Sequence, residues 1–346
     1  MGVIAVYINR IYKQLSGEIF VLPSRIIVLL FCLVLLLLPL ITKEPYTLRV
    51  LILASIFAIF SASWDLLSGF TGQMNFGHAL FFGVAAYTSA LLNLNLDLPV
   101  WLTIPIGALA AVLAGLIIGV PCLRLRGPYL ALVTLAFPLI LIGVVYAIPK
   151  ITGGELGISG ADPLSGSRTT VYYIAITLML ALGFIMWKIT DSKTGIILHA
   201  IREDEVTAKA SGINTTRYKL LAFSLSGLFA GIAGGLYAHF MPVVGPSTLE
   251  LMLSFQAIIW VVFGGIATIY GPIAGVFILS PLTEFLRVAP EIRMLLFAFV
   301  VMLILLFMPE GLTTWVRDKI EKICPRCKLR NVATRKSCRV CGAHLD

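Results

Sequence analysis

The chain has 346 residues, of which 59% are hydrophobic and only 12% are charged. Soluble domains carry about 25% charged residues, so this composition, with a mean hydropathy of +0.99, excludes an ordinary soluble protein and predicts an all-α polytopic protein of the cell membrane. The formal net charge of +9 requires no nucleic-acid partner, and none is expected, because Lys and Arg collect in the cytoplasmic connections of membrane proteins.

Long apolar segments without Asp, Glu, Lys or Arg follow one another along the chain, and a membrane crossing needs about 20 such residues. They are 26–42, 50–64, 66–96, 99–121, 128–149, 170–187, 220–241, 251–283 and 294–308. Two of them, 66–96 and 251–283, are too long for one ordinary crossing, and Gly271-Pro272 interrupts the second with a helix breaker. Reading 50–69 and 75–94, and likewise 251–270 and 272–287, as pairs of short spans predicts ten transmembrane helices, whereas a span plus a re-entrant loop in both places predicts eight. We prefer ten.

The basic residues are distributed unevenly among the connections. Of the 26 in the chain, three lie in 1–25, two are Arg124 and Arg126, six lie in 188–219 and nine lie from Arg317 onward. By the positive-inside rule these segments are cytoplasmic, so both termini are predicted to lie inside. The predicted domains are a cytoplasmic N-terminal segment (1–25), a transmembrane domain (26–316) and a cytoplasmic tail (317–346).

Small residues recur at helical spacing within the apolar segments. Gly227, Gly231 and Gly235 line one helical face, and Gly115 and Gly119 repeat the spacing. Because lipid supplies no hydrophobic drive for helix association, close approach through small residues does that work. We therefore expect these glycines to pack helices together rather than to touch a substrate.

A polar run, Ser68-Gly-Phe-Thr-Gly-Gln-Met-Asn-Phe-Gly-His78, lies deep in segment 66–96. Such a run is tolerated where a broken helix lines a cavity, and discontinuous helices hold substrate sites in transporters. The alternative is a kink whose polar groups bind neighbouring backbone. The predicted residues of a translocation path are Gln73, Asn75, His78, Tyr129 and Thr134.

Residues 188–219 form a charged connection between two clean spans. Ile201 to Ala210 contains good helix formers and no breaker, and Gly212 is a natural C-terminal stop, so the pattern predicts a short charged helix. Such a helix is too short to be a domain. It could dock into a cleft on a cytoplasmic partner, and the alternative is a solvated loop.

Several motifs occur in the same order as in a known family. They are Thr71–Ala79, Gly127–Ala136, Thr152–Ile158, Ile201–Asn214 continuing into Lys219–Ala238, Phe263–Thr268 and Met308–Leu312. From about residue 26 to 317, the chain resembles LivM-type permease subunits of the branched-chain amino acid ABC transporter family.

The resemblance implies an ATP-driven importer. This chain would pair with a second permease subunit of LivH type, two cytoplasmic ATPase subunits and an external substrate-binding protein. The chain contains no GxxxxGK[ST] phosphate loop, so it is not expected to be an enzyme, and ATP would bind only to the partner subunits.

The resemblance also assigns roles to residues on the two sides of the membrane. The ATPase-coupling residues would be Ile201, Arg202, Glu203, Asp204, Glu205, Ala208 and Gly212. On the opposite side, the loop 150–169 would face the binding protein through Gly153, Gly154 and Glu155.

The end of the chain departs from the family, whose members normally stop soon after the last span. Cys324-Pro-Arg-Cys327 and Cys338-Arg-Val-Cys341 form two CxxC pairs, and four thiolates suit a structural tetrahedral Zn²⁺ site. Two disulfides are the alternative, which a cytoplasmic location disfavours. The sequence predicts a small zinc ribbon. Anionic lipid headgroups, an ATPase subunit and RNA are the candidate partners of its basic residues, and proximity to the membrane favours lipid.

Two matters stay open at this point. An ion-coupled secondary transporter is the rival class, and it generally needs intramembrane carboxylates, for which Asp65 and Glu284 are the candidates. The substrate is the other: a branched-chain amino acid follows from the resemblance, but related permeases carry urea, other amides or sugars.

Overall fold

The structure is a computed structural model, and it describes residues 23–42, 44–122, 128–286, 295, 298–299, 301–302, 306–308, 310–327, 330–333, 335, 337–338 and 341–344. The described residues fall into two compact units, one drawn from 1–42 and 312–346 and the other from 43–311. The predicted segment 1–25 lies almost entirely outside the described residues, as do Arg124 and Arg126. The functional division at residues 26–316 and 317–346 stays a prediction.

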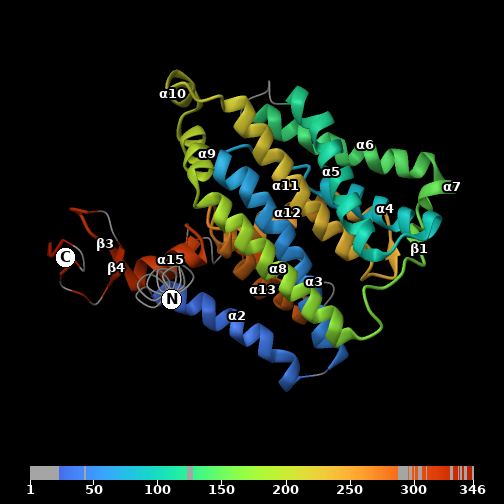
Figure 1. Cartoon of the computed structure of the whole chain (residues 1–346), viewed down its shortest axis with the longest axis horizontal. Helices are drawn as coiled ribbons and strands as arrows, with labels where there is room; N and C mark the ends of the chain where they lie inside the picture. The colour runs from blue at the N-terminus through green and yellow to red at the C-terminus, as the bar shows by residue number, and fades with distance from the viewer. Residues whose placement is uncertain are drawn as a thin grey trace, which may run out of the picture. The chain divides into compact units, whose positions relative to one another are not determined.

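Helices make up most of the larger unit, which Figure 1 shows as a bundle of long rods. Its elements are α3 (Pro45–Trp64), the π-helical turn η1 (Asp65–Gly69), α4 (Ala79–Leu96), α5 (Val100–Cys122), α6 (Pro128–Ala147), α7 (Pro149–Thr152), β1 (Ile158–Ser159), α8 (Arg168–Thr190), α9 (Lys193–Glu203), α10 (Glu205–Ala210), α11 (Thr215–Ala238), β2 (Val243–Val244), the 3₁₀ turn η2 (Pro246–Leu249), α12 (Leu251–Gly264) and α13 (Tyr270–Phe285).

Among the described residues, six helical segments are long and apolar enough to cross a membrane. They are Pro45–Gly69, Ala79–Leu96, Val100–Cys122, Tyr129–Ala147, Arg168–Thr190 and Thr215–Ala238, with shorter apolar helices at Ile26–Leu40 and Leu251–Gly264. The predicted class, an all-α polytopic membrane protein, is confirmed. The choice between ten and eight crossings and the location of the termini stay predictions.

Both overlong segments are divided into two helices. The break in 66–96 falls between η1 and α4, where the sequence places its polar run. The break in 251–283 was predicted at Gly271-Pro272, and that position is wrong: α12 ends at Gly264, and Pro272 lies in the first turn of α13. Proline is tolerated there because the first N–H groups of a helix have no intrahelical partner.

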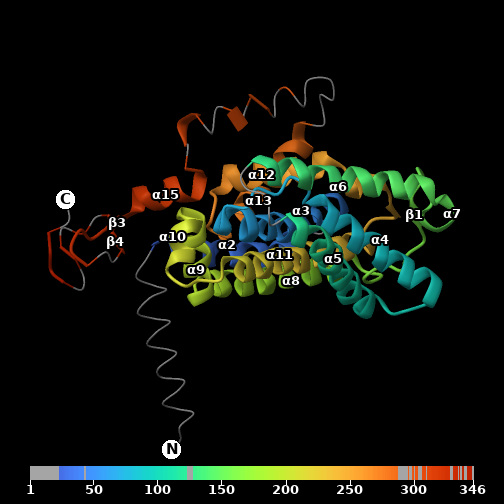
Figure 2. The same ribbon diagram turned by 90° about the horizontal axis from the view of Figure 1, so that it is seen from above.

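Helix α3 is at the centre of the larger unit. It packs against α8, α11, α12 and α13, while α11 packs against α4 and α5. Figure 2 shows α3 between α12 and α13 on one side and α8 and α11 on the other. Because α3 is surrounded, Ile52, Ile56 and Phe60 are almost fully buried.

The glycine face of α11 brings its backbone against neighbouring helices. A Cβ at Gly231 would lie 2.7 Å from the Cα of Ala108, and a Cβ at Gly235 would lie 3.2 Å from the Cα of Ile104. Gly231 and Gly235 therefore pack α11 onto α5, whereas Gly227 meets the ring of Phe81 on α4.

The connections that were predicted to lie on opposite sides of the membrane lie at opposite ends of the larger unit. Figure 1 shows α9 and α10 at one end and α7 and β1 at the other. Helix α11 links the two ends with 24 residues, which is about 36 Å of helix and exceeds the roughly 30 Å of the hydrocarbon layer.

The smaller unit contains α2 (Pro23–Ile41), α15 (Leu312–Ile320), β3 (Glu321–Ile323) and β4 (Arg330–Val332). Helix α2 contacts α15. Strands β3 and β4 form an antiparallel hairpin in which Glu321 pairs with Val332 and Ile323 pairs with Arg330.

The close approach at Gly231 makes a prediction. Gly231→Ala should destabilise the protein by about 1–3 kcal/mol, because the added methyl group must displace the backbone of α5. The measurement is the thermal unfolding midpoint of the purified protein in detergent. Gly143→Ala is the matched control, since nothing lies within 4 Å of a Cβ at that position; equal midpoints for the two variants would contradict the packing assignment.

Candidate functional site

The charged connection between α8 and α11 folds as two helices rather than the single helix predicted from Ile201 to Ala210. Asp204 has extended backbone angles (φ −154°, ψ 106°) and separates α9 from α10. Its carboxylate accepts hydrogen bonds from the backbone N–H groups of Val206 at 2.8 Å and Thr207 at 3.2 Å. An aspartate cap of this kind competes with helix continuation, which is why the single-helix prediction was wrong. Hydrogen bonds from the side chain and backbone of Thr207 lower the pKa of Asp204.

The predicted helix stop is confirmed at Gly212, whose φ is +83°. The N–H of Ile213 donates to the carbonyl of Ala208 at 3.2 Å, and the N–H of Gly212 donates to that of Lys209 at 3.1 Å. This pair of bonds is the Schellman arrangement. It closes α10 into a compact unit.

The α9–α10 segment is fastened to the bundle and leaves one charged side open. The Lys219 ammonium lies 2.6 Å from the Glu205 carboxylate, with the Lys219 side chain only 11% exposed. Ala208, a residue of α10, is buried. The exposed residues of the segment include Arg202, Glu203, Asp204, Val206 and Lys209. A polar surface that also exposes the apolar side chains of Ile196 and Val206 suits a protein partner.

Helix α9 also contacts the end of η1. The Arg202 guanidinium donates a hydrogen bond to the Gly69 carbonyl, and the rings of His199 and Phe70 meet edge to face at 5.0 Å. Ile201 is buried. The segment predicted to receive force from an ATPase is therefore attached to the broken helix of the core.

The other end of η1 is attached to the break between α12 and α13. The buried Asp65 carboxylate accepts from the backbone N–H groups of Ala267 at 2.7 Å, Thr268 at 3.1 Å and Ile269 at 3.2 Å. Ala267 and Ile269 have φ values of 61° and 52°, a conformation that is costly for a β-branched residue. Asp65 therefore serves as a fixed backbone cap, which is a structural role and not the one that ion coupling would need.

The predicted path residues lie mostly inside the bundle. Gln73, Asn75, His78 and Thr134 are buried, whereas Tyr129 is 70% exposed on α6. Thr134 accepts from the N–H of Phe76 at 3.1 Å, and the Asn75 side chain accepts from the N–H of Gly77 at 2.9 Å. Neighbouring backbone thus satisfies part of this polar run, as the alternative reading expected.

Other polar atoms of the run have no partner among the described residues. They are both amide atoms of Gln73, Nδ2 of Asn75 and Nδ1 of His78. The Nε2 of His78 lies 2.9 Å from Ser63 Oγ and 3.2 Å from the Phe60 carbonyl oxygen. Because a carbonyl only accepts, Nε2 carries the proton and Nδ1 is a free acceptor. Unpaired buried polar groups are costly, so these atoms are available to water or substrate.

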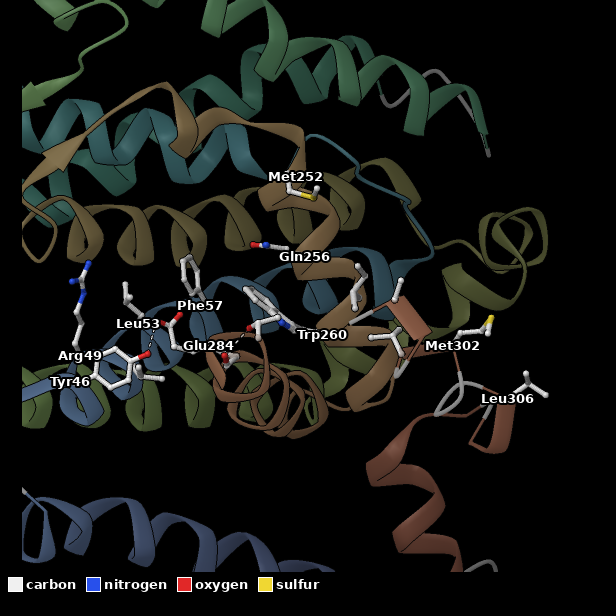
Figure 3. A pocket seen from close by; sticks show the side chains of 16 residues that line it. Tyr46, Arg49, Leu53, Phe57, Met252, Gln256, Trp260, Glu284, Met302 and Leu306 are labelled. Carbon is white, nitrogen blue, oxygen red and sulfur yellow. Dashed lines mark hydrogen bonds between the residues drawn. The ribbon is translucent and has the colours of Figure 1, made fainter. Parts of the chain in front are cut away.

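A cavity of about 960 Å³ lies between α3, α12 and α13. None of the predicted path residues lines it. Figure 3 shows Tyr46, Arg49 and Glu284 at one end, Phe57 and Trp260 in the middle, and Met302 and Leu306 at the other end. Apart from Glu284, which was considered for ion coupling, sequence reasoning missed these residues. The available signal was Arg49, a charge just ahead of an apolar segment.

The opposite end of the larger unit carries the loop predicted to meet a binding protein. Gly153 and Gly154 have φ values of 73° and 57°, and strands β1 and β2 hold the loop by pairing Ile158 with Val244. Glu155 is exposed, and the neighbouring Leu156 is 88% exposed. Leu156 is an exposed apolar residue of this loop that sequence reasoning did not select.

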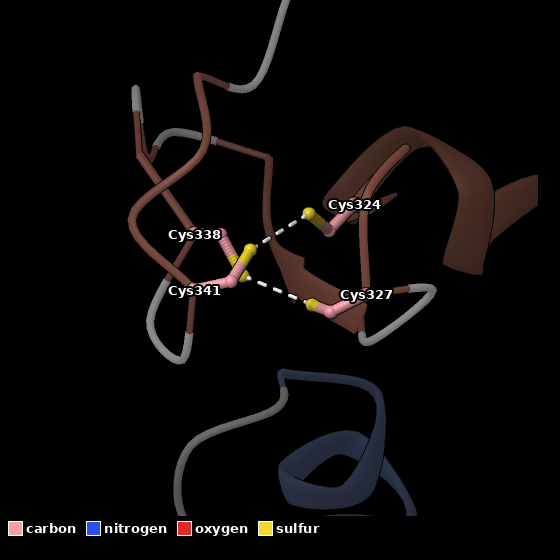
Figure 4. A group of neighbouring side chains, drawn as sticks. All are labelled: Cys324, Cys327, Cys338 and Cys341. Carbon is pink, nitrogen blue, oxygen red and sulfur yellow. Dashed lines mark hydrogen bonds between the residues drawn. The ribbon is translucent and has the colours of Figure 1, made fainter.

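The smaller unit contains the cysteine cluster drawn in Figure 4. The four sulfur atoms of Cys324, Cys327, Cys338 and Cys341 lie within 4.8 Å of one another. Two of the separations, Cys324 to Cys341 and Cys327 to Cys338, are 3.5 Å. Tetrahedral zinc with Zn–S bonds of about 2.3 Å needs sulfur atoms about 3.8 Å apart, so this donor set fits a metal ion.

Local hydrogen bonds shape both cysteine turns. Backbone N–H groups of Cys327 and then Arg326 lower the pKa of the Cys324 thiol, which favours the thiolate that metals bind. In the second turn, Gly342 has a φ of 70° and donates to the Cys338 carbonyl at 3.1 Å. All four thiols are free of disulfides.

Comparison with known proteins identifies the family. Residues 46–306 match the family described as branched-chain amino acid transport system / permease component. The high-affinity branched-chain amino acid transport system permease protein LivM of Escherichia coli K12 is 31% identical over 93% of this chain and 83% of that protein. LivM of Salmonella typhimurium is 29% identical over 90% and 82%, respectively.

A relative of the second permease type is also similar. The high-affinity branched-chain amino acid transport system permease protein LivH of Salmonella typhimurium is 26% identical over 78% of this chain and 94% of that protein. The family match covers most of the chain and includes every described element from α3 to α13. This chain therefore belongs to the family of branched-chain amino acid transport permease components.

Proposed function

We propose that this chain is the LivM-type permease subunit of an ATP-driven importer of branched-chain amino acids. Its partners are a second permease subunit of LivH type, two cytoplasmic ATPase subunits and an external substrate-binding protein. ATP is bound and hydrolysed by the partner subunits alone. Family membership and the names of the relatives support this proposal.

The observation that carries the mechanism is the continuous contact from the α9–α10 segment to the bundle core. Arg202 holds the last residue of η1, and Asp65, the first residue of η1, holds the α12–α13 break. A displacement of α9 by an ATPase would therefore reach three core helices without crossing a flexible loop. Ile201, Arg202, Glu203, Asp204, Glu205, Ala208 and Gly212 are the proposed coupling residues.

On the outer side, the proposed docking surface for the binding protein is the loop of Gly153, Gly154 and Glu155, extended by Leu156. An exposed apolar side chain beside a charge is a common pattern at protein interfaces. Within the bundle, the unpartnered atoms of Gln73, Asn75 and His78 support a role for the polar run in the translocation path.

Reconstitution tests the function as a whole. The complete complex in proteoliposomes, supplied with the binding protein and with ATP inside, should import L-leucine, L-isoleucine and L-valine only while ATP is hydrolysed. Uptake driven by a proton gradient without ATP would assign the chain to secondary transporters. ATP-driven uptake of urea, another amide or a sugar instead would support the assignment as an ATP-driven importer and contradict the assignment of its substrate.

Coupling is tested by Arg202→Met, which keeps the side-chain stem and removes the donor to Gly69. We expect leucine import per ATP hydrolysed to fall about tenfold while ATP hydrolysis continues, because a charge-assisted hydrogen bond contributes on the order of 1.5–3 kcal/mol. Arg217→Met, on the exposed first turn of α11, is the matched control. An unchanged import-to-hydrolysis ratio in Arg202→Met would remove Arg202 from the coupling route.

The cysteine cluster is proposed to hold one structural Zn²⁺. Purified protein should contain about one zinc per chain by elemental analysis, since four thiolates leave no open coordination position. Cys324→Ser with Cys327→Ser should abolish zinc retention, whereas Cys32→Ser, outside the cluster, should leave it unchanged. Metal-free protein with four reactive tail thiols would refute the site.

A further inference from the structure

The cavity between α3, α12 and α13 is walled by whole helix faces. On α3 its lining residues are Tyr46, Arg49, Val50, Leu53 and Phe57. The last four follow Tyr46 by three, four, seven and eleven positions, so all five share one side of the helix. The cavity volume of about 960 Å³ lies at the upper end of the range for small-molecule sites. The space is therefore a feature of how the helices pack.

Opposite charges gather at one end of this cavity. Tyr46 donates a hydrogen bond from its hydroxyl to the Glu284 carboxylate at 2.7 Å, and Arg49 lies one helical turn after Tyr46 on the same lining face. Charged groups at membrane depth are costly and usually serve function. Glu284 and Arg49 both line this end of the cavity, and a carboxylate and a guanidinium lining one end match the two charges of an α-amino acid, with Arg suited to a carboxylate.

The rest of the cavity is apolar. Phe57 and Trp260 lie with ring centroids 5.4 Å apart, and Leu53, Met302 and Leu306 extend the wall. Trp260 is only 4% exposed, and its Nε1 has no hydrogen-bond partner among the described residues. A buried donor left unpaired is costly, and a bound solute or water molecule would relieve it.

The direction of α3 places the charged end on the outer side. The C-terminal end of α3 continues into η1, which contacts Arg202 of the proposed ATPase-coupling segment. Tyr46 and Arg49 lie in the first turns of α3 and therefore at the end away from that segment. A solute released by an external binding protein would meet the charged groups first.

We infer that this cavity binds the zwitterion of an apolar α-amino acid within the permease. Arg49 holds the α-carboxylate, Glu284 oriented by Tyr46 holds the α-ammonium, and the aliphatic side chain lies against Phe57 and Trp260. This inference rests on the proposed function and adds the site and the groups that recognise the substrate. It also predicts that neutral amides and sugars, which offer no pair of charges, bind this cavity more weakly than an apolar amino acid does.

Competition on the unmodified complex tests the inference. The complex in lipid nanodiscs, without the binding protein, is loaded with radiolabelled L-leucine. Two competitors are then added: 4-methylpentanoate, which lacks the ammonium, and 3-methylbutylamine, which lacks the carboxylate. Each should displace leucine at least about tenfold less well than unlabelled leucine, because one charge-assisted contact is missing. Displacement equal to that by leucine, or no leucine binding, would overturn the inference.

Two variants test which side chain of the cavity binds which charged group of the amino acid. Glu284→Gln should weaken leucine binding about tenfold and leave binding of 4-methylpentanoate unchanged, while Arg49→Gln should spare 3-methylbutylamine instead. Glu250→Gln and Lys150→Gln are matched controls, since both residues are exposed and neither lines the cavity. If a variant weakens the binding of leucine and of both competitors equally, the substituted residue has only a structural role and the assignment is refuted.

The outcomes separate this inference from the proposed function. The cavity assignment alone fails if the unmodified complex imports leucine with ATP and both variants bind and import leucine as well as the unmodified complex. If the unmodified complex imports no branched-chain amino acid, the proposed function fails. ATP hydrolysis reports assembly of each variant. Should Glu284→Gln not assemble, Tyr46→Phe, which removes only the orienting hydroxyl, should weaken leucine binding severalfold, and unchanged binding would count against the site.

Discussion

The interaction on which most of the larger unit depends is the Asp65 carboxylate bound to three consecutive backbone N–H groups, those of Ala267, Thr268 and Ile269. Lipid offers no water to satisfy a broken helix, so the backbone groups at the α12–α13 break must find partners inside the protein. One carboxylate supplies them and stabilises left-handed backbone at Ala267 and Ile269. Gly69 is required beside it, because a Cβ there would collide with the Asp65 carboxylate.

The same carboxylate joins two functional parts of the molecule. Residues 65–69 form η1, which has Arg202 at its C-terminal end and the α12–α13 break at its N-terminal end. Helix α3, which enters η1 directly, lines the cavity together with helices α12 and α13 and with residues such as Met302 and Leu306. A rigid π-helical turn thus connects the surface proposed for ATPase docking with the space proposed for the amino acid, and π-helical turns are frequent at functional sites.

The buried polar groups of the bundle differ in how well they are satisfied. At the end of the bundle that carries α7 and β1, His239 donates from Nδ1 to the Asp162 carbonyl at 2.7 Å, and its Nε2 lies 3.0 Å from the Ser89 hydroxyl and 2.8 Å from that of Thr103. That cluster holds the loop that contains Asp162 to α4, α5 and α11. The amide of Gln73, by contrast, has no partner among the described residues. Satisfied networks rigidify a core, and a buried polar group without a partner is costly.

The amino-acid sequence alone determined the membrane class, the long spans, the glycine packing face, the stop at Gly212 and the clustering of the four tail cysteines, because each depends on composition or local spacing. Tertiary structure decided the rest. Spacing suggested a helix through Asp204, but the side chain caps α10 instead. Tyr46 and Glu284 are 238 positions apart, and Asp65 and Ala267 are 202 apart. Which polar side chains meet in a bilayer depends on which helices pack together, and no local pattern in the chain records that.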